Sequence, residues 1–135
     1  MPREPVEATR RVYEAWARGD FRSATALYDP NVLLVLRPEF PEAGAYVGPE
    51  QIAGYMRDLV ASLTDFAIEA EDFVEAGDSV VVQVRQHGVG RSSGAVTEHR
   101  YFQVLTWRGE KIVRIESIAD REQALAAVGL REHPH

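Results

Sequence analysis

Cysteine is absent from this chain of 135 residues. A disulfide framework, a thiolate nucleophile and a metal site built from cysteine are therefore excluded, and the lack of cysteine fits a reducing cytoplasm. Clustered positive charge is also missing, because lysine and arginine are scattered among acidic residues and the formal net charge is −6. Nucleic-acid binding needs clustered cations to contact phosphates, so we expect no nucleic-acid partner.

Long apolar segments are missing too. The longest apolar runs, such as residues 32–36, are far too short to cross a bilayer, and the polar start of the chain does not fit a signal peptide. We therefore expect a cytoplasmic protein with no membrane partner. The chain, 45% hydrophobic, suits a single domain over residues 1–135 with a real core, and residues 131–135 read as a frayed tail.

Apolar spacing predicts helices in the first half of the chain. We expect one helix over residues 6–18, a short second helix capped by Asp20, and a third helix with Pro49 in its first turn. A strand at residues 32–36 follows the second helix. Residues 37–48 hold two prolines and two glycines and are expected to form a loop.

The second half of the chain has the pattern of strands separated by turns. The expected strands cover residues 67–75, 79–88, 96–108 and 112–118, and a short helix capped by Asp120 follows them. Helices followed by an antiparallel meander are typical of the α+β class, with the helices on one face of the sheet.

Strand pairing divides the sheet into two faces. If Arg108 and Lys111 close the last hairpin, and the hairpin before it is centred near Ser93, Val84 lies opposite Phe102. The face expected to point toward the helices is then Val80, Val82, Val84, Gln86, Arg100, Phe102, Val104, Thr106, Val113, Ile115, Ser117 and Ala119. The other face holds Val81, Gln83, Arg85, His87, His99, Tyr101, Gln103, Leu105, Trp107, Arg114, Glu116 and Ile118, a mixture that suggests a homodimer interface. A slip of one residue would exchange the two faces.

Several short motifs occur in an order and spacing typical of one superfamily. They are Tyr13-Glu-Ala-Trp-Ala-Arg-Gly-Asp20, Tyr28-Asp-Pro-Asn-Val32, Pro38-Glu-Phe-Pro-Glu-Ala-Gly44, Tyr46-Val-Gly-Pro-Glu50, Gly109-Glu-Lys-Ile-Val-Arg114 and Asp120-Arg-Glu-Gln-Ala-Leu125. With them the chain resembles the nuclear transport factor 2-like superfamily, specifically its SnoaL-like branch, over residues 6–130. The resemblance implies a strongly curved antiparallel or mixed sheet that forms a cone with the N-terminal helices around an internal pocket, and a dimer through the outer sheet face. This fold hosts many functions, so it implies no single reaction.

The known enzyme sites of the superfamily are not retained in this chain. In ketosteroid isomerases the base position falls on Leu36, the tyrosine position on Val12, and the second acid on Phe102, or on Gln103 under a different hairpin alignment. The polar set of limonene-epoxide hydrolases falls on Gln86, Val84, Ser117, Leu34 and Leu36. The acid/base residue of the polyketide cyclases has no identifiable counterpart.

The expected pocket combines apolar walls with a few polar groups. Arg100 is the first candidate to polarise a substrate oxygen, assisted by Gln86 and Ser117, while Glu39 or Asp120 would move a proton. The alternatives are a structural ion pair for Arg100 and a solvated carboxylate for Glu39. The expected ligand contacts are Tyr13, Trp16, Leu34, Leu36, Tyr46, Tyr55, Met56, Val84, Gln86, Phe102, Val104 and Ser117.

We expect no metal and no cofactor. His87 and His99 fall nearly opposite one another, but two imidazoles without a third ligand are weak evidence for a metal site. The leading hypothesis is a protein that binds a small apolar or aromatic molecule bearing an oxygen function and that, as an enzyme, is a cofactor-independent isomerase, cyclase, lyase or hydrolase. The alternatives are a non-catalytic ligand-binding or dimeric interaction protein, and an epoxide hydrolase-like enzyme with a non-standard site.

Overall fold

The computed structural model describes residues 4–130, so the tail expected at residues 131–135 lies outside the described part of the chain. The chain begins with helix α1 and a short 3₁₀ helix, η1, and continues with two strands, helix α2, four longer strands and helix α3. The bounds are α1 Pro5–Ala17, η1 Ser23–Leu27, β1 Tyr28–Leu36, β2 Gly44–Val47, α2 Gly48–Ala61, β3 Leu63–Ala76, β4 Ser79–Gly90, β5 Val96–Arg108, β6 Lys111–Ile118 and α3 Arg121–Ala127.

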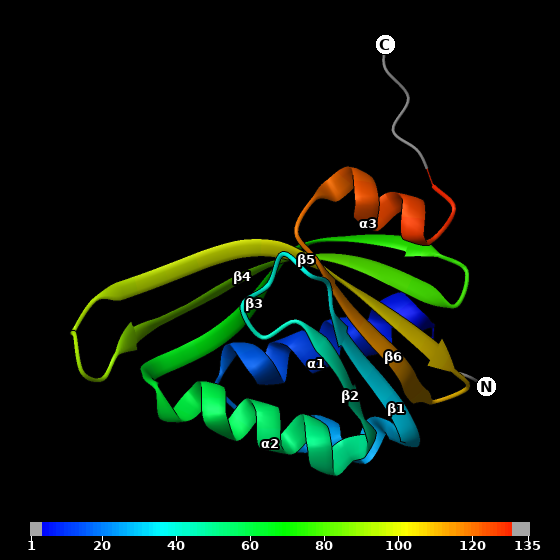
Figure 1. Ribbon diagram of the computed structural model, residues 1–135. Coiled ribbons are helices and arrows are strands. Elements are labelled where there is room, and N and C mark those ends of the chain that lie inside the picture. Colours follow the sequence, from blue (N-terminus) through cyan, green and yellow to red (C-terminus); the bar gives the residue numbers. More distant parts are fainter. Residues whose placement is uncertain (1–3, 131–135) are drawn as a thin grey trace.

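The strands form one mixed sheet in the order β2-β1-β6-β5-β4-β3. The pairing of β1 with β6 is parallel, and the other neighbouring strands are antiparallel. The sheet is strongly curved, with α1 and α2 on one face and α3 on the other (Figure 1). The expected α+β fold, a cone-shaped sheet covered by the N-terminal helices, is confirmed.

Local sequence signals account for the helix ends. Pro5 and Pro49 lie in the first turns of α1 and α2, where proline removes no helical hydrogen bond. Gly19 ends α1 with a φ of 78°, a conformation that glycine adopts without steric cost. The carboxylate of Asp120 accepts a hydrogen bond from the backbone N–H of Gln123 at 3.0 Å, which caps α3 as expected.

The segment of residues 37–48 contains one strand that the sequence did not predict. Strand β2 pairs antiparallel with β1, with Tyr46 opposite Leu34. It is short and largely exposed, and it lies at the edge of the sheet. An edge strand of this kind has no buried face, and so it lacks the alternation that would reveal it.

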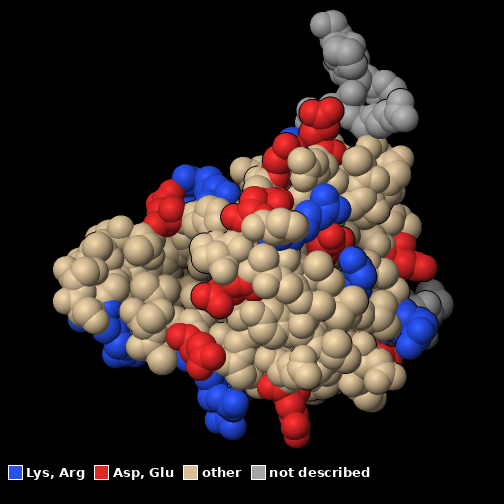
Figure 2. Space-filling view, viewed as in Figure 1, with Lys and Arg blue, Asp and Glu red and all other residues tan. Residues whose placement is uncertain are grey.

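The main core lies between the concave face of the sheet and the two long helices. It is built from side chains of α1, β1 and the inner positions of β4, β5 and β6. A smaller apolar cluster lies on the opposite face under α3 and contains Val81, Val104, Ile118 and Ala124, with Phe102 packed against it. No helix within residues 4–130 is long and apolar enough to cross a membrane. Acidic and basic side chains are interspersed on the face seen in Figure 2.

The face assignment is correct for β4 but wrong for β5. Val84 pairs with Tyr101 rather than with Phe102, and Gln103 lies opposite Ser117. Consequently Arg100 does not point into the cone. The residues of β5 that share the inner face are His99, Tyr101, Gln103, Leu105 and Trp107, and those on the outer face include Arg100, Phe102 and Val104.

Two local features explain the difference. The β4–β5 hairpin closes with Gly90 opposite Ala95, because the N–H of Gly90 donates to the carbonyl of Ala95 at 2.9 Å; its centre therefore lies half a residue before Ser93. A bulge then inserts Val113 into β6, since Trp107 pairs with Ile112 but Thr106 pairs with Arg114. The first feature turns β5 over, and the bulge returns Ile115 and Ser117 to the inner face.

Candidate functional site

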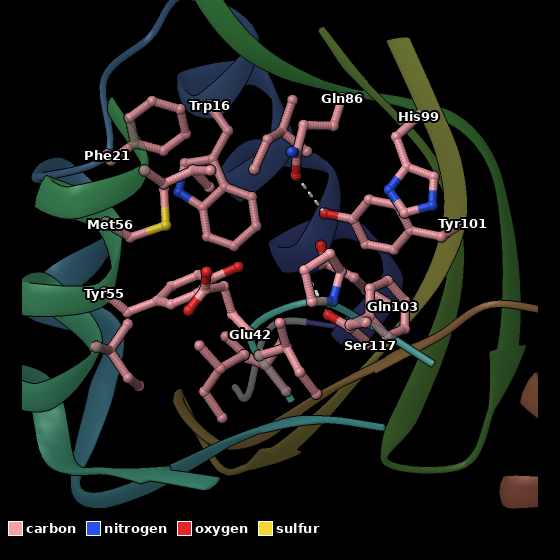
Figure 3. Close-up of a pocket in the computed structure, with 18 of the residues that line it drawn as sticks. Trp16, Phe21, Glu42, Tyr55, Met56, Gln86, His99, Tyr101, Gln103 and Ser117 are labelled. Atoms are coloured by element: carbon pink, nitrogen blue, oxygen red, sulfur yellow. Dashed lines mark hydrogen bonds between the residues drawn. The ribbon is translucent and has the colours of Figure 1, made fainter. Parts of the chain in front are cut away.

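A cavity of about 250 Å³ lies between the inner face of the sheet and the helices. Its walls come from α1, α2, β1 and the inner positions of β3 to β6, together with the segment before η1 and the segment between β1 and β2 (Figure 3). The lining residues are Trp16, Phe21, Tyr28, Leu34, Leu36, Phe40, Pro41, Glu42, Ile52, Tyr55, Met56, Leu59, Ile68, Gln86, His99, Tyr101, Gln103, Ile115 and Ser117. Apolar and aromatic side chains dominate this set, which is typical of a small-molecule site.

The helix side of the cavity is almost entirely apolar. Trp16 comes from α1, and Tyr55 and Met56 come from one face of α2 (Figure 3). The ring of Trp16 packs edge-on against Tyr13, with 4.9 Å between the centroids. The indole N–H of Trp16 is buried and, within residues 4–130, is the one buried side-chain polar atom without a hydrogen-bond partner.

The sheet side carries a buried chain of hydrogen bonds that starts on α1. The hydroxyl of Tyr13 donates to Oε1 of Gln103 at 2.5 Å, and Nε2 of Gln103 donates to Oγ of Ser117 at 3.3 Å. Tyr13, Gln103 and Ser117 are all buried. These hydrogen bonds therefore connect α1 to the cavity wall through the neighbouring strands β5 and β6.

A second polar pair lies further along the same wall. The hydroxyl of Tyr101 donates to Oε1 of Gln86 at 2.8 Å. Next to it, the rings of Phe40, His99 and Tyr101 pack together, with centroid distances of 5.7 Å from Phe40 to His99 and 4.9 Å from His99 to Tyr101. His99 and Glu42 are exposed although they line the cavity, so they mark its mouth.

Burial keeps the tyrosines around the cavity protonated. Desolvation raises the pKa of Tyr28 to about 12 and that of Tyr55 to about 12. Burial also raises the pKa of Tyr13 and Tyr101 above the ordinary range, and the charges of neighbouring tyrosines add to this effect. These hydroxyl groups therefore act as hydrogen-bond donors near neutral pH and cannot act as bases.

The structure brings part of the predicted site together. Seven of the residues expected to contact a ligand line the cavity: Trp16, Leu34, Leu36, Tyr55, Met56, Gln86 and Ser117. Tyr13 lies behind Gln103, and Val84 is fully buried in the core. Tyr46 packs on Tyr55 with 5.0 Å between ring centroids, outside the lining set.

The residues predicted to carry the chemistry lie elsewhere. Arg100 is on the outer face, where it forms ion pairs with Glu71 at 3.0 Å and with Glu98; these carboxylates raise its pKa further. The structural ion pair is therefore the correct alternative for Arg100. Phe102 and Val104 pack under α3. Glu39 is exposed outside the lining set, and the carboxylate of Asp120 is engaged in capping α3.

The two strand histidines lie on opposite faces of the sheet. His87 points outward and its Nε2 lies 3.0 Å from Oε2 of Glu69, while His99 lines the cavity. Within residues 4–130 no group of histidine and acidic side chains could hold a metal ion. The cavity lining includes neither lysine nor arginine.

Sequence reasoning missed four notable cavity residues. The sequence pattern places His99, Tyr101 and Gln103 on the outer face together with Leu105 and Trp107, and it places Glu42 in a loop, whereas all four residues line the cavity. One signal did point to Gln103, because the alternative hairpin alignment put the second acid position of ketosteroid isomerases there. The structure has that alternative pairing, and an amide stands at the position.

Comparison with known proteins gives relatives of similar size. An uncharacterised protein of Mycobacterium tuberculosis is 25% identical over 111 residues, which cover 82% of this chain and 84% of the relative. An NTF2-like protein from Burkholderia thailandensis has a similar structure, with a TM-score of 0.78 and 27% identity over 87% of this chain and 92% of that one. The structure of TerC co-crystallised with polyporic acid has a TM-score of 0.72 and 21% identity, over 92% of this chain and 96% of that one.

The model of one domain family matches most of this chain. Residues 9–115 match the SnoaL-like domain, a range that includes most of α1, strands β1 to β5, the first part of β6 and every lining residue except Ser117. The resemblance inferred from the motifs is confirmed, and this chain belongs to the SnoaL-like domain family.

Proposed function

We propose that this protein binds a small, mostly apolar molecule with an oxygen function in the cavity between α1, α2 and the sheet. The observation that carries the proposal is the composition of the cavity wall, which is mostly apolar and carries a few hydrogen-bonding groups, most of them on the sheet side. A wall of this kind binds by burying apolar surface and orients the ligand through a few polar contacts. The co-crystal of TerC with polyporic acid supports small-molecule binding in this fold.

Binding is tested with neutral bicyclic probes such as α-tetralone. A ligand present at about 100 times its Kd should stabilise the folded protein by about 2.7 kcal/mol, and for a domain of this size this raises the Tm by several degrees. The fluorescence of Trp16 should change at the same time, since its ring lines the cavity. Leu36→Trp fills the cavity and should abolish both effects. The matched control is Phe102→Trp on the outer face of the same sheet, which should preserve them.

A specific observation favours proton transfer as the chemistry of this site. His99 places an imidazole at the mouth of the cavity, beside the polar pair of Tyr101 and Gln86. Imidazole exchanges protons readily near neutral pH, and a carbonyl held by hydrogen-bond donors forms an enolate more easily. We therefore propose cofactor-free acid/base catalysis of the isomerase or cyclase type, in which His99 takes a proton from the carbon next to the carbonyl and returns it.

The catalytic proposal is tested by hydrogen exchange at carbon. In deuterated water the protein should accelerate exchange of the protons next to the carbonyl of α-tetralone, measured by proton NMR. His99→Gln should remove the acceleration, whereas His87→Gln should leave it unchanged because His87 lies on the opposite face. Tight binding of α-tetralone without accelerated exchange would contradict the catalytic proposal and leave a ligand-binding protein.

A further inference from the structure

The buried chain Tyr13–Gln103–Ser117 determines which hydrogen-bonding groups the cavity offers to a ligand. Its members come from α1, β5 and β6, and Gln103 and Ser117 are paired directly across the two strands. All three side chains are buried, with exposed fractions of 2%, 6% and 3% respectively. Each polar atom therefore has few alternative partners, and each hydrogen bond fixes the direction of the next.

The two hydrogen-bond partners of Gln103 define the orientation of its amide. The oxygen of Gln103 accepts from the hydroxyl of Tyr13, and its nitrogen donates to Oγ of Ser117 at 3.3 Å. An amide has one acceptor atom and one donor atom, so the two contacts together use both ends of the Gln103 side chain. Burial, which raises the pKa of Tyr13, keeps the hydroxyl proton in place for this contact.

The amide orientation leaves Ser117 as a donor to the cavity. An amide nitrogen has protons but no free lone pair, so the oxygen of Ser117 must accept from it. The hydroxyl proton of Ser117 must then go elsewhere. The described part of the chain gives it no acceptor, and Ser117 lines the cavity.

The wall also offers other donors besides Ser117. The buried indole N–H of Trp16 has no hydrogen-bond partner among residues 4–130. Trp16 lies on the helix side of the cavity, while Ser117 lies on the sheet side (Figure 3). The oxygen of Gln86 is engaged by Tyr101, which leaves the protons of the Gln86 amide nitrogen for a ligand. The lining contains no lysine or arginine, and Glu42 adds a carboxylate at the mouth. A negatively charged ligand would therefore lose its hydration without a cation to replace it.

We propose that Tyr13, acting through Gln103, orients Ser117 as a hydrogen-bond donor, and that the cavity consequently selects neutral ligands with a carbonyl oxygen. This inference rests on the proposed small-molecule binding and names the ligand class for the same site. Tyr13 and Gln103 are positioning residues in this arrangement, and Ser117 contacts the ligand. An acceptor oxygen matches the donors of the wall, whereas a hydrocarbon leaves them unpaired and an ammonium group presents a further donor to them.

The test compares three probes of nearly equal shape: α-tetralone, tetralin and protonated aminotetralin. Kd values are measured for each by Trp16 fluorescence. The wild-type protein should bind α-tetralone roughly threefold to tenfold more tightly than tetralin, and aminotetralin more weakly than either. The infrared C=O stretch of bound α-tetralone should lie at a lower wavenumber than in a hydrocarbon solvent, because the carbonyl accepts a hydrogen bond.

Two variants separate the proposed orientation from simple packing. Ser117→Ala should remove the preference for the ketone and the infrared shift while the affinity for tetralin stays the same. Tyr13→Phe should weaken the preference as well, although Tyr13 lies outside the lining set, because the freed amide can turn its oxygen toward Ser117 and take up the hydroxyl proton. Ser79→Ala, on the outer face beside Thr106, is the matched control and should change nothing.

The outcomes distinguish this inference from the proposed function. Equal binding of α-tetralone and tetralin, or a ketone preference that survives Ser117→Ala, would overturn the donor assignment while small-molecule binding stands. A preference lost in Ser117→Ala but intact in Tyr13→Phe would overturn the positioning role of Tyr13. Failure of both neutral probes to bind would overturn the proposed function and this inference together.

Discussion

The indole N–H of Trp107 donates to the hydroxyl of Thr9 at 2.8 Å, across the boundary between β5 and α1. Both residues are buried, and Thr9 is completely inaccessible. The contact attaches α1 to the inner face of the sheet less than two helical turns before Trp16 enters the cavity wall. The N–H of Trp107 therefore has a partner, whereas that of Trp16 has none within the described residues 4–130.

Removing the hydroxyl of Thr9 should destabilise the protein measurably. Thr9→Val keeps the shape of the side chain but leaves the buried N–H of Trp107 unpaired, which costs about 1–3 kcal/mol. The free energy of unfolding from urea titration measures the loss. Thr9→Ser retains the hydroxyl and should lose less. An unfolding free energy for Thr9→Val equal to that of the wild type would show that the hydrogen bond adds nothing to stability.

The order of elements follows from local signals that tertiary packing reinforces. Prolines in the first turns of α1 and α2, the left-handed Gly19 and the cap at Asp120 mark helix ends in the sequence itself. The apolar stripes of the helices then determine which of their side chains face the sheet, and the apolar residues of β1 determine which of its side chains face the helices. This is why residues such as Trp16, Leu36 and Met56 could be assigned to the cavity correctly.

The orientation of β5 could not be predicted in the same way, because both of its faces are partly apolar. Val104 and Phe102 on the outer face are covered by α3, so the alternation that normally separates inside from outside is weak. The predicted faces follow from a hairpin centre near Ser93 and from a β6 strand without a bulge at Val113. Neither is encoded by a local pattern strong enough to detect. The hairpin centre decides whether Arg100 or its neighbours face the cavity, and the bulge decides which residues of β6 do.

The buried tyrosines make the protein sensitive to alkali. Burial raises the pKa of Tyr28 from 10.0 to about 12, so the folded state holds this proton at pH values where the unfolded chain releases it. The sign follows from linkage: the contribution to stability is complete below the unfolded pKa and is lost as pH rises through the folded one. Unfolding free energies measured by urea should therefore fall between about pH 10 and pH 12, by about 2 kcal/mol for this residue.

Replacing Tyr28 identifies its share of the alkaline loss. Tyr28→Phe should flatten the dependence of unfolding free energy on pH above pH 10, and its phenolate absorbance should show one fewer late-titrating group. Adding Tyr55→Phe should flatten the curve further, since burial also raises the pKa of Tyr55 to about 12. Parallel curves for wild type and both variants would contradict the assignment.

Glu98 makes the outer face sensitive to acid. Its carboxylate accepts from the guanidinium of Arg85, with Nε and Oε2 separated by 3.2 Å, and also pairs with Arg100. These contacts, led by the hydrogen bond from Arg85, lower the pKa of Glu98. The stabilising contribution is therefore present above the unfolded pKa and is lost as pH falls through the folded one. Glu98→Gln should make the Tm less dependent on pH as the pH falls below the pKa of an unfolded glutamate. If the Tm of Glu98→Gln changes with pH as steeply as that of the wild type, this carboxylate does not contribute.

Asp65 adopts a left-handed backbone conformation that restricts which residues the start of β3 accepts. Its φ is 53°, and the pairing of β3 with β4 is interrupted between Thr64 and Ala67. Aspartate tolerates this conformation better than most residues, whereas a β-branched side chain clashes with the backbone there. Asp65→Val should therefore lower the free energy of unfolding by about 1–2 kcal/mol.

Glycine at the same position separates backbone strain from the loss of a charge. Asp65→Gly relieves the steric cost but makes the unfolded chain more flexible, so the two effects should nearly cancel, within about 0.5 kcal/mol. Asp65 is exposed, so neither substitution changes the core. Urea unfolding of both variants measures the difference between them. If Asp65→Val and Asp65→Gly are equally stable, the left-handed conformation does not persist in the folded protein.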